Sequence, residues 1–452
     1  MADTSSTSSL HSDSTSASAT QAPEHQSISP FSASFTDKNL SVARSIYFKT
    51  LIGGTFAITI AMFAVFSIYW GALWKTPAHS LKGWIIDFDQ SNIGNTVSQA
   101  VVASSATSRI NWTVMSAAVF PGGSTEVANR IVDEKAWVAI VVNSGASAAL
   151  NSAVSSANSS YDGSQAVTVY GVEARNENAF RSIIRPTVQG VLEATAERFA
   201  LQFARQVLAN SSSSSLQNLF SNAPQVVTRP IGYTIVNLRP FDVPVASAIT
   251  FVGLIYLLIL SFFIVMIGVS AREMSGLEKH LTTSSLIRVR FTSTFIAYFF
   301  LSLFYSLLSK AFLVDFSRRF GDGGFVLFWM LNFVGMLSVG LALEAMITLL
   351  TARFVPFFMI LWVISNVAVC FMPLDVLPRI YHYGYAFPFY NVSKAIRTIL
   401  FSTKNEVGLN FGILLAWVAI SCMTLPLFQW IMRRKHIDEI NHAFEPNEKV
   451  AA

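Results

Sequence analysis

The stretch VGLIYLLILSFFIVMIGVS, residues 252–270, contains no charged side chain. It belongs to a longer uncharged run, residues 245–270, that is bounded by Asp242 and Arg272. A helix needs roughly 20 mostly apolar residues to cross the hydrocarbon core of a bilayer. This run is therefore predicted to be a transmembrane helix, and it decides the class of fold.

Five other stretches meet the same requirement of length and apolar character. They are residues 51–70, the charge-free segment between Arg290 and Lys310, and residues 325–350, 354–373 and 411–432. Only Thr351-Ala352-Arg353 separates the fourth predicted span from the fifth, which allows a tight turn. The first span starts too far from the N-terminus for a cleavable signal peptide, so we expect it to remain as a signal anchor. The sequence predicts a polytopic α-helical membrane protein with six transmembrane helices.

The composition agrees with a surface that faces lipid. Of the 452 residues, 52% are hydrophobic and only 13% are charged, whereas soluble chains average about 25% charged. The formal net charge of +5 is modest, and the basic residues cluster beside hydrophobic runs, so a nucleic-acid partner is not expected. Both cysteines fall inside hydrophobic runs, which excludes a disulfide framework in the long hydrophilic segment.

The distribution of Lys and Arg predicts the orientation. With the N-terminus inside, the cytoplasmic segments carry twelve Lys or Arg and the short outer loops carry seven. Three N-glycosylation motifs, at Asn111, Asn158 and Asn210, lie in the long segment after the first span. Chance is the alternative, because this segment is rich in Asn and Ser. We expect both termini in the cytoplasm and the long segment on the other side.

These boundaries divide the chain into five parts. The first 36 residues contain 17 Ser or Thr, a composition typical of a disordered tail, with a phosphorylated regulatory tail as the sharper alternative. The parts are a disordered cytoplasmic tail (1–46), transmembrane helix 1 (47–74), an extracytoplasmic domain (75–244), a bundle of five transmembrane helices (245–435) with an aromatic outer loop (374–410), and a cytoplasmic tail (436–452).

The segment 75–244 alternates between strand-like and helix-like patterns, which favours an α/β or α+β domain. Strands are predicted at 83–89, 111–119, 137–142, 167–172 and 231–237. Helices are predicted at 125–135, 146–157 and 176–209, the last with a break at Pro186. The domain is close to electrically neutral, which argues against capture of strongly charged ligands.

The outer loop, residues 374–410, contains YHYGYAFPFY at 381–390, a density of aromatic rings typical of the membrane interface. Residues 391–401 follow with one apolar face and with Lys394 and Arg397 opposite to it. We expect an amphipathic helix that lies at the outer interface. An ordinary aromatic-rich loop is the alternative.

Signatures of enzyme chemistry are missing from the sequence. It has no G-x-x-x-x-G-K-[ST] motif, no H-E-x-x-H, no C-x-x-C and no G-x-S-x-G. We therefore expect no catalytic site, no metal site and no cofactor. Any activity driven by ATP requires a partner chain.

Glu344 is the one acidic residue inside a predicted span. A charge in lipid is costly, by about 2.5 kcal/mol or more, and such residues are candidates for function. One interpretation is structural, with Glu344 at the interface or paired with a cation such as Arg353. The other is coupling to protons or substrate.

Asn332 and Asn366 are polar groups within predicted spans. Hydrogen bonds across helices are the expected role, and a place on the wall of a pore is the alternative. One face of the fourth span is small, which favours close helix packing; its residues are Gly335, Ser338, Gly340, Ala342 and Ala345.

Several strings of residues resemble one protein family. They are NLRPF (237–241), VGLIYLLILSFF (252–263), YHYGYAFP (381–388), RTILFSTK (397–404), GWIIDFD (83–89) and AWVAIVV (136–142). They are similar to the fungal nitrosoguanidine-resistance protein family, a domain of unknown function related to ABC-2-type exporter membrane domains and the phage-infection protein. The resemblance implies six spans at the plasma membrane, and a role in resistance to toxic molecules or in lipid organisation. It brings no catalytic residues.

Three functions follow as hypotheses. The first is export of toxic small molecules, or support of such export. The second is a non-transporting scaffold or regulator of lipid organisation. A membrane enzyme ranks last. The expected partners are membrane lipids and a possible separate membrane protein or ATPase. Substrate, direction of transport and oligomeric state are not predicted.

Overall fold

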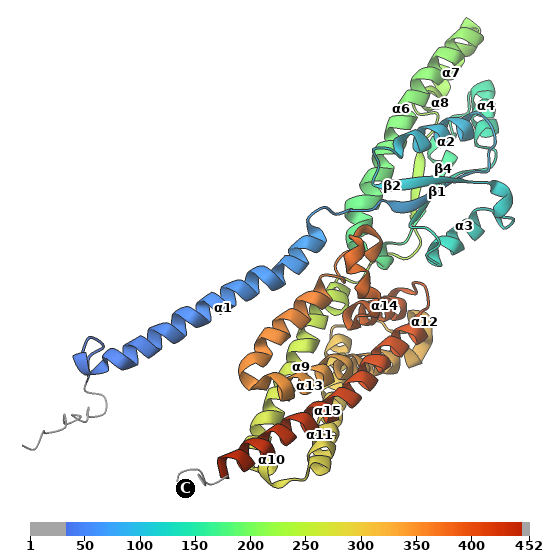
Figure 1. Cartoon of the computed structure of the whole chain (residues 1–452). Coiled ribbons are helices and arrows are strands. Elements are labelled where there is room, and N and C mark those ends of the chain that lie inside the picture. Colours follow the sequence, from blue (N-terminus) through green and yellow to red (C-terminus); the bar gives the residue numbers. More distant parts are fainter. Residues whose placement is uncertain (1–32, 445–452) are drawn as a thin grey trace, which may run out of the picture. The chain divides into compact units, whose positions relative to one another are not determined.

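The computed structural model describes residues 33–444, with the side chains of residues 33–439 (Figure 1). The described residues divide into two compact units, one up to Ile60 and the other from Ala61 onward. In the first unit a short 3₁₀ turn, Lys38–Leu40, leads into helix α1, Ser41–Leu73, which continues into the second unit.

The start of α1 corrects one boundary. The tail predicted for residues 1–46 falls largely outside the described residues, but α1 begins at Ser41, inside that segment. Residues 41–46 contain neither glycine nor proline, so nothing in this stretch stops the helix before the apolar run.

Within the described residues, five helices are long and apolar enough to cross a membrane. They span Lys38–Leu73, Ala248–Met274, Thr283–Ala311, Ser317–Val367 and Val407–Glu439. This count differs from the six predicted spans in one place. The predicted fourth and fifth spans belong to a single helical stretch.

That stretch contains helix α13, Gly324–Val367, and α13 is interrupted at Thr351. Thr351 has φ 67° and ψ 166°, a conformation that β-branched residues rarely adopt. Strain of this kind costs about 1–3 kcal/mol and persists only where the surrounding structure imposes it. The break lies at the tripeptide where the sequence predicts a turn.

The bundle is built around α13. It packs against α9 (Gly253–Met274), α11 (Thr283–Ala311), α14 (Pro388–Phe401) and α15 (Val407–Phe444). Short elements connect these helices: η6 (Ala248–Val252), α10 (Leu277–His280), α12 (Ser317–Phe320), η7 (Gly321–Gly323), η8 (Leu374–Val376) and η9 (Arg379–Ala386).

The small face of α13 allows one close contact in particular. A Cβ atom at Gly340 would lie 2.1 Å from the hydroxyl oxygen of Tyr298 on α11. That hydroxyl donates a hydrogen bond of 3.0 Å to the carbonyl of Ser261 on α9. Glycine at position 340 therefore makes room for a tyrosine that joins three helices.

Residues 81–237 form a small mixed sheet with its helices, which we call the sheet domain. The strands are β1 (Leu81–Asp87), β2 (Ile110–Met115), β3 (Val138–Val142), β4 (Val167–Gly171) and β5 (Tyr233–Asn237). Their order is β2-β1-β3-β4-β5, and all neighbours are parallel except β3 and β4. Each strand overlaps one predicted from the sequence.

Helices cover both faces of this sheet. Side chains that alternate along the strands, such as Ile85 and Ile86, belong to different hydrophobic clusters. One face packs against α2 (Asn92–Ser104), α4 (Ala146–Ser156) and α6 (Arg185–Asn210). The other packs against α3 (Gly123–Val132). The sequence did not predict α2.

The long helical stretch does not break at Pro186. Helix α5 (Glu177–Ala179) continues through a π-helical turn, η5 (Phe180–Ile184), into α6. Pro186 is in the first turn of α6, where a missing backbone N–H is tolerated. The remaining helices, α7 (Ser213–Asn222) and α8 (Gln225–Thr228), lead to β5.

A crevice in an open sheet normally lies at the carboxyl ends of the strands where the strand order reverses. Here β1 has β2 on one side and β3 on the other, so Asp87 ends the strand at that point. Asp89 accepts hydrogen bonds from the backbone N–H of Ser147, 2.9 Å, and from its hydroxyl, 2.5 Å, at the start of α4. Asp87 lies against Gly94 of α2. The protein's own carboxylates occupy this position.

Candidate functional site

Glu344 lies in α13 with a side chain that is only 2% exposed, and two arginines contact it. Its Oε1 is 2.8 Å from Nε of Arg290 on α11 and 3.1 Å from Nη1 of Arg272 on α9. Arg353, which the sequence suggested as a partner, instead lies over the ring of Phe354, 5.6 Å from its centroid. Glu344 is thus paired with cations, as the structural interpretation expects, but its partners are Arg272 and Arg290 instead of Arg353.

The guanidinium of Arg290 donates four hydrogen bonds, one of them to the Glu344 carboxylate. It donates to the carbonyl of Glu344 over 2.7 Å, to Oγ1 of Thr348 over 2.8 Å and to Oε1 of Gln429 over 2.5 Å. Gln429 belongs to α15, so one side chain joins three helices. We call Arg272, Glu344 and Arg290 the Arg–Glu–Arg cluster. It holds two cations and one carboxylate.

A cavity of about 790 Å³ lies beside the cluster, among residues near the ends of α9, α11 and α15 and at the break in α13. We call it the basic cavity. Its charged lining residues are Arg272, Lys279, Arg290, Arg433, Glu273 and Glu278. Apolar lining residues include Val269, Ile347, Met432 and Ile437. The cavity is lined by both charged and apolar side chains, a combination that suits an amphiphilic molecule.

The two asparagines lie away from this cavity. Asn332 donates a hydrogen bond of 3.0 Å to Oγ of Ser306 on α11. Asn366 donates to the carbonyl of Trp362 and accepts from the backbone N–H of Phe389 at the start of α14. Both asparagines thus make hydrogen bonds within the packed bundle.

Helix α14 shows why the predicted interfacial helix needs correction. Its polar residues Lys394 and Arg397 do not face a lipid surface, because acidic groups of the sheet domain lie against them. Nη1 of Arg397 is 2.5 Å from Oε2 of Glu177 and 3.1 Å from the carbonyl of Ala174. Both charged side chains of this pair are more than nine-tenths buried.

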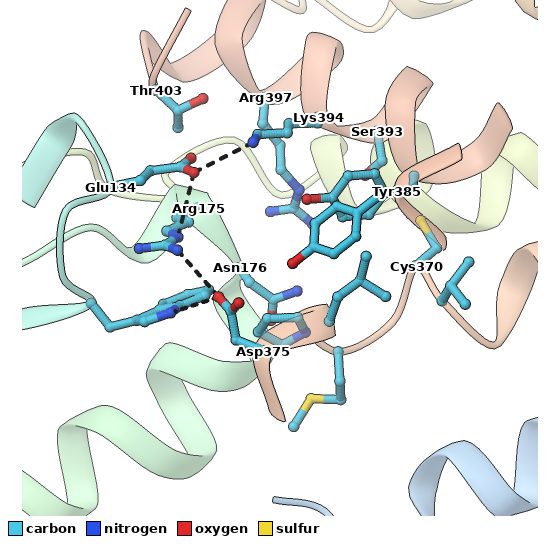
Figure 2. A pocket seen from close by; sticks show the side chains of 16 residues that line it. Glu134, Arg175, Asn176, Cys370, Asp375, Tyr385, Ser393, Lys394, Arg397 and Thr403 are labelled. Atoms are coloured by element: carbon cyan, nitrogen blue, oxygen red, sulfur yellow. Dashed lines mark hydrogen bonds and ion pairs between the residues drawn. The ribbon is translucent and has the colours of Figure 1, made fainter. Parts of the chain in front are cut away.

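We call the whole contact between the sheet domain and residues 374–401, including the pair of Arg397 and Glu177, the junction. Figure 2 shows the part of the junction around Glu134, Arg175 and Asp375. Oδ2 of Asp375 accepts from the indole of Trp137, 3.0 Å, and lies 3.4 Å from Arg175. The Arg175 guanidinium is 3.4 Å from the Trp137 ring centroid. Glu134 lies between Arg175, 3.9 Å, and Lys394, 3.4 Å. A cavity of about 70 Å³ remains among these groups.

The surroundings of Glu177 act on the pKa of its carboxyl group in opposite directions. Burial alone raises the pKa of Glu177, but the charge of Arg397 and its hydrogen bond outweigh that effect and hold the pKa below its ordinary value. The carboxylate therefore stays ionised in the junction at neutral pH.

The three predicted glycosylation sites are all exposed in the sheet domain. Asn111 lies on the edge strand β2, Asn158 follows α4, and Asn210 is the last residue of α6. The chain has two further motifs of this kind, which were not among the predicted sites. Asn391-Val-Ser393 is one, with Asn391 buried in α14, and Asn39-Leu-Ser41 at the start of α1 is the other.

Glycosylation tests the predicted orientation directly. We expect a mass shift on treatment with endoglycosidase, and we expect the combined change Asn111→Gln, Asn158→Gln and Asn210→Gln to abolish it. Electrophoresis of membrane fractions measures both. A shift that survives the triple change and is abolished by Asn39→Gln would contradict the orientation, because Asn39 precedes α1 on the predicted cytoplasmic side.

The comparisons with known proteins give a family and a curated membrane protein to which this chain is similar. The family model described as "Protein of unknown function (DUF3533)" matches residues 55–423. A curated relative is the "Uncharacterized endoplasmic reticulum membrane protein YJR015W" of Saccharomyces cerevisiae. It is 27% identical over 433 residues, which cover 90% of this chain and 84% of the relative. No solved structure matches.

Proposed function

Because the chain belongs to the DUF3533 family, and is a multi-pass membrane protein, we propose that it binds amphiphilic small molecules within its bundle and exports them or supports their export. The observation that carries this proposal is the basic cavity. Its volume of about 790 Å³ lies within the range of about 300–1,000 Å³ that is usual for small-molecule sites.

The location of the cavity supports movement through the bundle. It lies near the ends of α9, α11 and α15, and Thr351, the break in α13, is part of its wall. A straight helix of 44 residues would be about 66 Å long, roughly twice the hydrocarbon core. We therefore propose that the two halves of α13 cross the membrane separately. That gives six crossings, both termini in the cytoplasm and the sheet domain outside it.

Resistance to toxic molecules and a relation to ABC-2-type exporters stay part of this proposal, supported by the resemblance of residues 237–263 and 381–404. The protein is not proposed as an enzyme. Energy for transport would come from a gradient or from a separate ATPase partner.

Flux through reconstituted protein tests the proposal. We expect purified full-length protein in liposomes to transport a fluorescent anionic amphiphile under a proton or ion gradient. Ala352→Trp places a large side chain on the cavity wall and should reduce flux to the level of protein-free liposomes. Phe354→Trp, a lipid-accessible change two residues away, is the matched control and should retain flux.

Absence of flux under every gradient would exclude the autonomous transporter. Support of export then requires an ATPase that copurifies with the wild type and restores flux when added. Failure of both would overturn the proposal.

A scaffold or regulator of lipid organisation is the second candidate, and the junction favours it. Ion pairs of Arg397 with Glu177 and of Lys394 with Glu134 hold the sheet domain against α14, as a scaffold requires. Copurification of other membrane proteins, lost on disruption of the junction, would support this function. Transport of the probe by purified protein from which no other protein copurifies would contradict it.

The compartment is also a proposal. The resemblance implies the plasma membrane, whereas the yeast relative is named as an endoplasmic reticulum membrane protein. We favour the endoplasmic reticulum for this chain. Microscopy of a C-terminal fluorescent fusion distinguishes a perinuclear ring from a signal at the cell edge.

A further inference from the structure

We propose that the basic cavity binds the phosphodiester group of an anionic ligand, and that Arg272 is its main contact. The inference deepens the proposed function, because it names the chemistry of the molecule that enters the same cavity. A phospholipid headgroup and a soluble phosphodiester share this chemistry.

Arg272 carries the argument because its donors are available. A guanidinium has five N–H groups and stays protonated in proteins. The side chain of Arg272 is only 9% exposed, yet its one polar contact among the described residues is the carboxylate of Glu344, at 3.1 Å. Arg290, by contrast, donates to four oxygens. Arg272 lines the cavity with donors left over for a ligand.

The charges around the cavity point to a single negative charge. Four cations, Arg272, Lys279, Arg290 and Arg433, face three carboxylates, Glu273, Glu278 and Glu344. His436 also lines the cavity and is left out of this count. The balance is one surplus cation. A phosphodiester carries one negative charge and offers two oxygens to the planar fork of an arginine.

The geometry of the walls favours a ligand with an apolar part. Ile347 and Met432 line the cavity beside the charged groups, and Val269 lies one turn before Arg272 on α9. An inorganic anion would leave these side chains against water. A lipid would place its phosphate at Arg272 and an acyl chain along the apolar wall.

Binding to the purified full-length protein tests the inference. The probes are dioctanoyl phosphatidylglycerol, the soluble phosphodiester glycerophosphoglycerol, and dioctanoylglycerol as the phosphate-free control. We expect Arg272→Gln to weaken binding of the phospholipid by about tenfold or more, as loss of a charge-assisted hydrogen bond predicts. Isothermal titration calorimetry in a neutral detergent measures the affinity.

Arg288→Gln is the matched control. Arg288 lies on α11 near the same end of the bundle, carries the same charge and is exposed outside the cavity. We expect this variant to bind as the wild type does. Equal affinity of wild type and Arg272→Gln would overturn the inference, and so would an equal loss in Arg288→Gln, because that result indicates general surface attraction.

Folding of the variant is checked by size-exclusion chromatography and thermal unfolding. Arg272→Gln leaves the pair of Arg290 and Glu344 intact, so we expect it to fold. Should it aggregate, Ala352→Trp blocks the cavity without changing a charge and must also abolish binding. Tight binding of the soluble probe identifies a soluble ligand, and preference for the lipid identifies a headgroup. Equal binding of the phosphate-free control contradicts the inference.

The two proposals can fail separately. Phosphodiester binding that depends on Arg272, without flux, leaves this inference standing and removes the transporter. Flux that is unaffected by Arg272→Gln supports the proposed function and overturns the inference.

Discussion

Glu344→Gln is expected to lower the free energy of unfolding by about 3–5 kcal/mol, the usual cost of breaking a buried ion pair from one side. The change leaves two guanidiniums, Arg272 and Arg290, close together in the bundle without a carboxylate between them. Arginine cannot relieve this by losing its proton. Thermal unfolding of the purified protein in detergent, with the yield from membranes, measures the loss.

Arg272→Gln provides the internal comparison. It removes the surplus cation and leaves one carboxylate beside one guanidinium, so we expect a much smaller loss of stability than for Glu344→Gln. Similar unfolding temperatures for the two variants would contradict the charge balance proposed for the cluster. A variant Glu344→Gln that folds normally but loses flux would instead support the coupling role considered from the sequence.

Arg397→Met is expected to be the second severe change, again by about 3–5 kcal/mol. It leaves the carboxylate of Glu177 buried between the sheet domain and α14 without its cation. The expected signature is a lower unfolding temperature and faster proteolysis between the sheet domain and the bundle. The double change Arg397→Met with Glu177→Met should recover part of the loss, because no charge is then stranded.

The matched control is the ion pair of Arg318 and Asp242, which also lies at this side of the bundle, at 2.8 Å. Both side chains are about one-third or more exposed, so Arg318→Gln should cost about 0–1 kcal/mol. An equal loss in the two single variants would contradict the importance of burial.

Acid should act on the junction in a defined direction. The folded-state pKa of Glu177 lies below its ordinary value, so the pair stabilises the protein fully above the unfolded-state pKa of about 4.3. That contribution is lost as the pH falls through the lower, folded-state pKa.

The helices and strands that could be predicted from the sequence are those that neighbouring residues determine on their own. Each strand of the sheet overlaps a predicted one, because β-branched and aromatic residues such as those of Val138–Val142 and Val167–Gly171 favour strands. Helix α2 was missed because its Asn, Ser, Thr and Val residues are weak helix formers. The spacing of Ile93, Val97 and Val101, four residues apart and all buried, is the signal that could have found it.

The candidate site could be predicted from the sequence only in part. Hydropathy alone singled out Glu344, since an acid within an apolar run is conspicuous. Its partners depend on how α9 and α11 are rotated against α13, which no local pattern contains. The same holds for Arg397 and Glu177, which are 220 positions apart. The charged face of α14 was recognised, but what covers it is a separate part of the chain.

The carboxylate of Asp89 is hydrogen-bonded to the first turn of α4, and this limits what else can bind there. A guest anion would have to compete with a tethered one that is always present at effectively high concentration. Any ligand for this edge of the sheet would first have to displace the Asp89 side chain from Ser147.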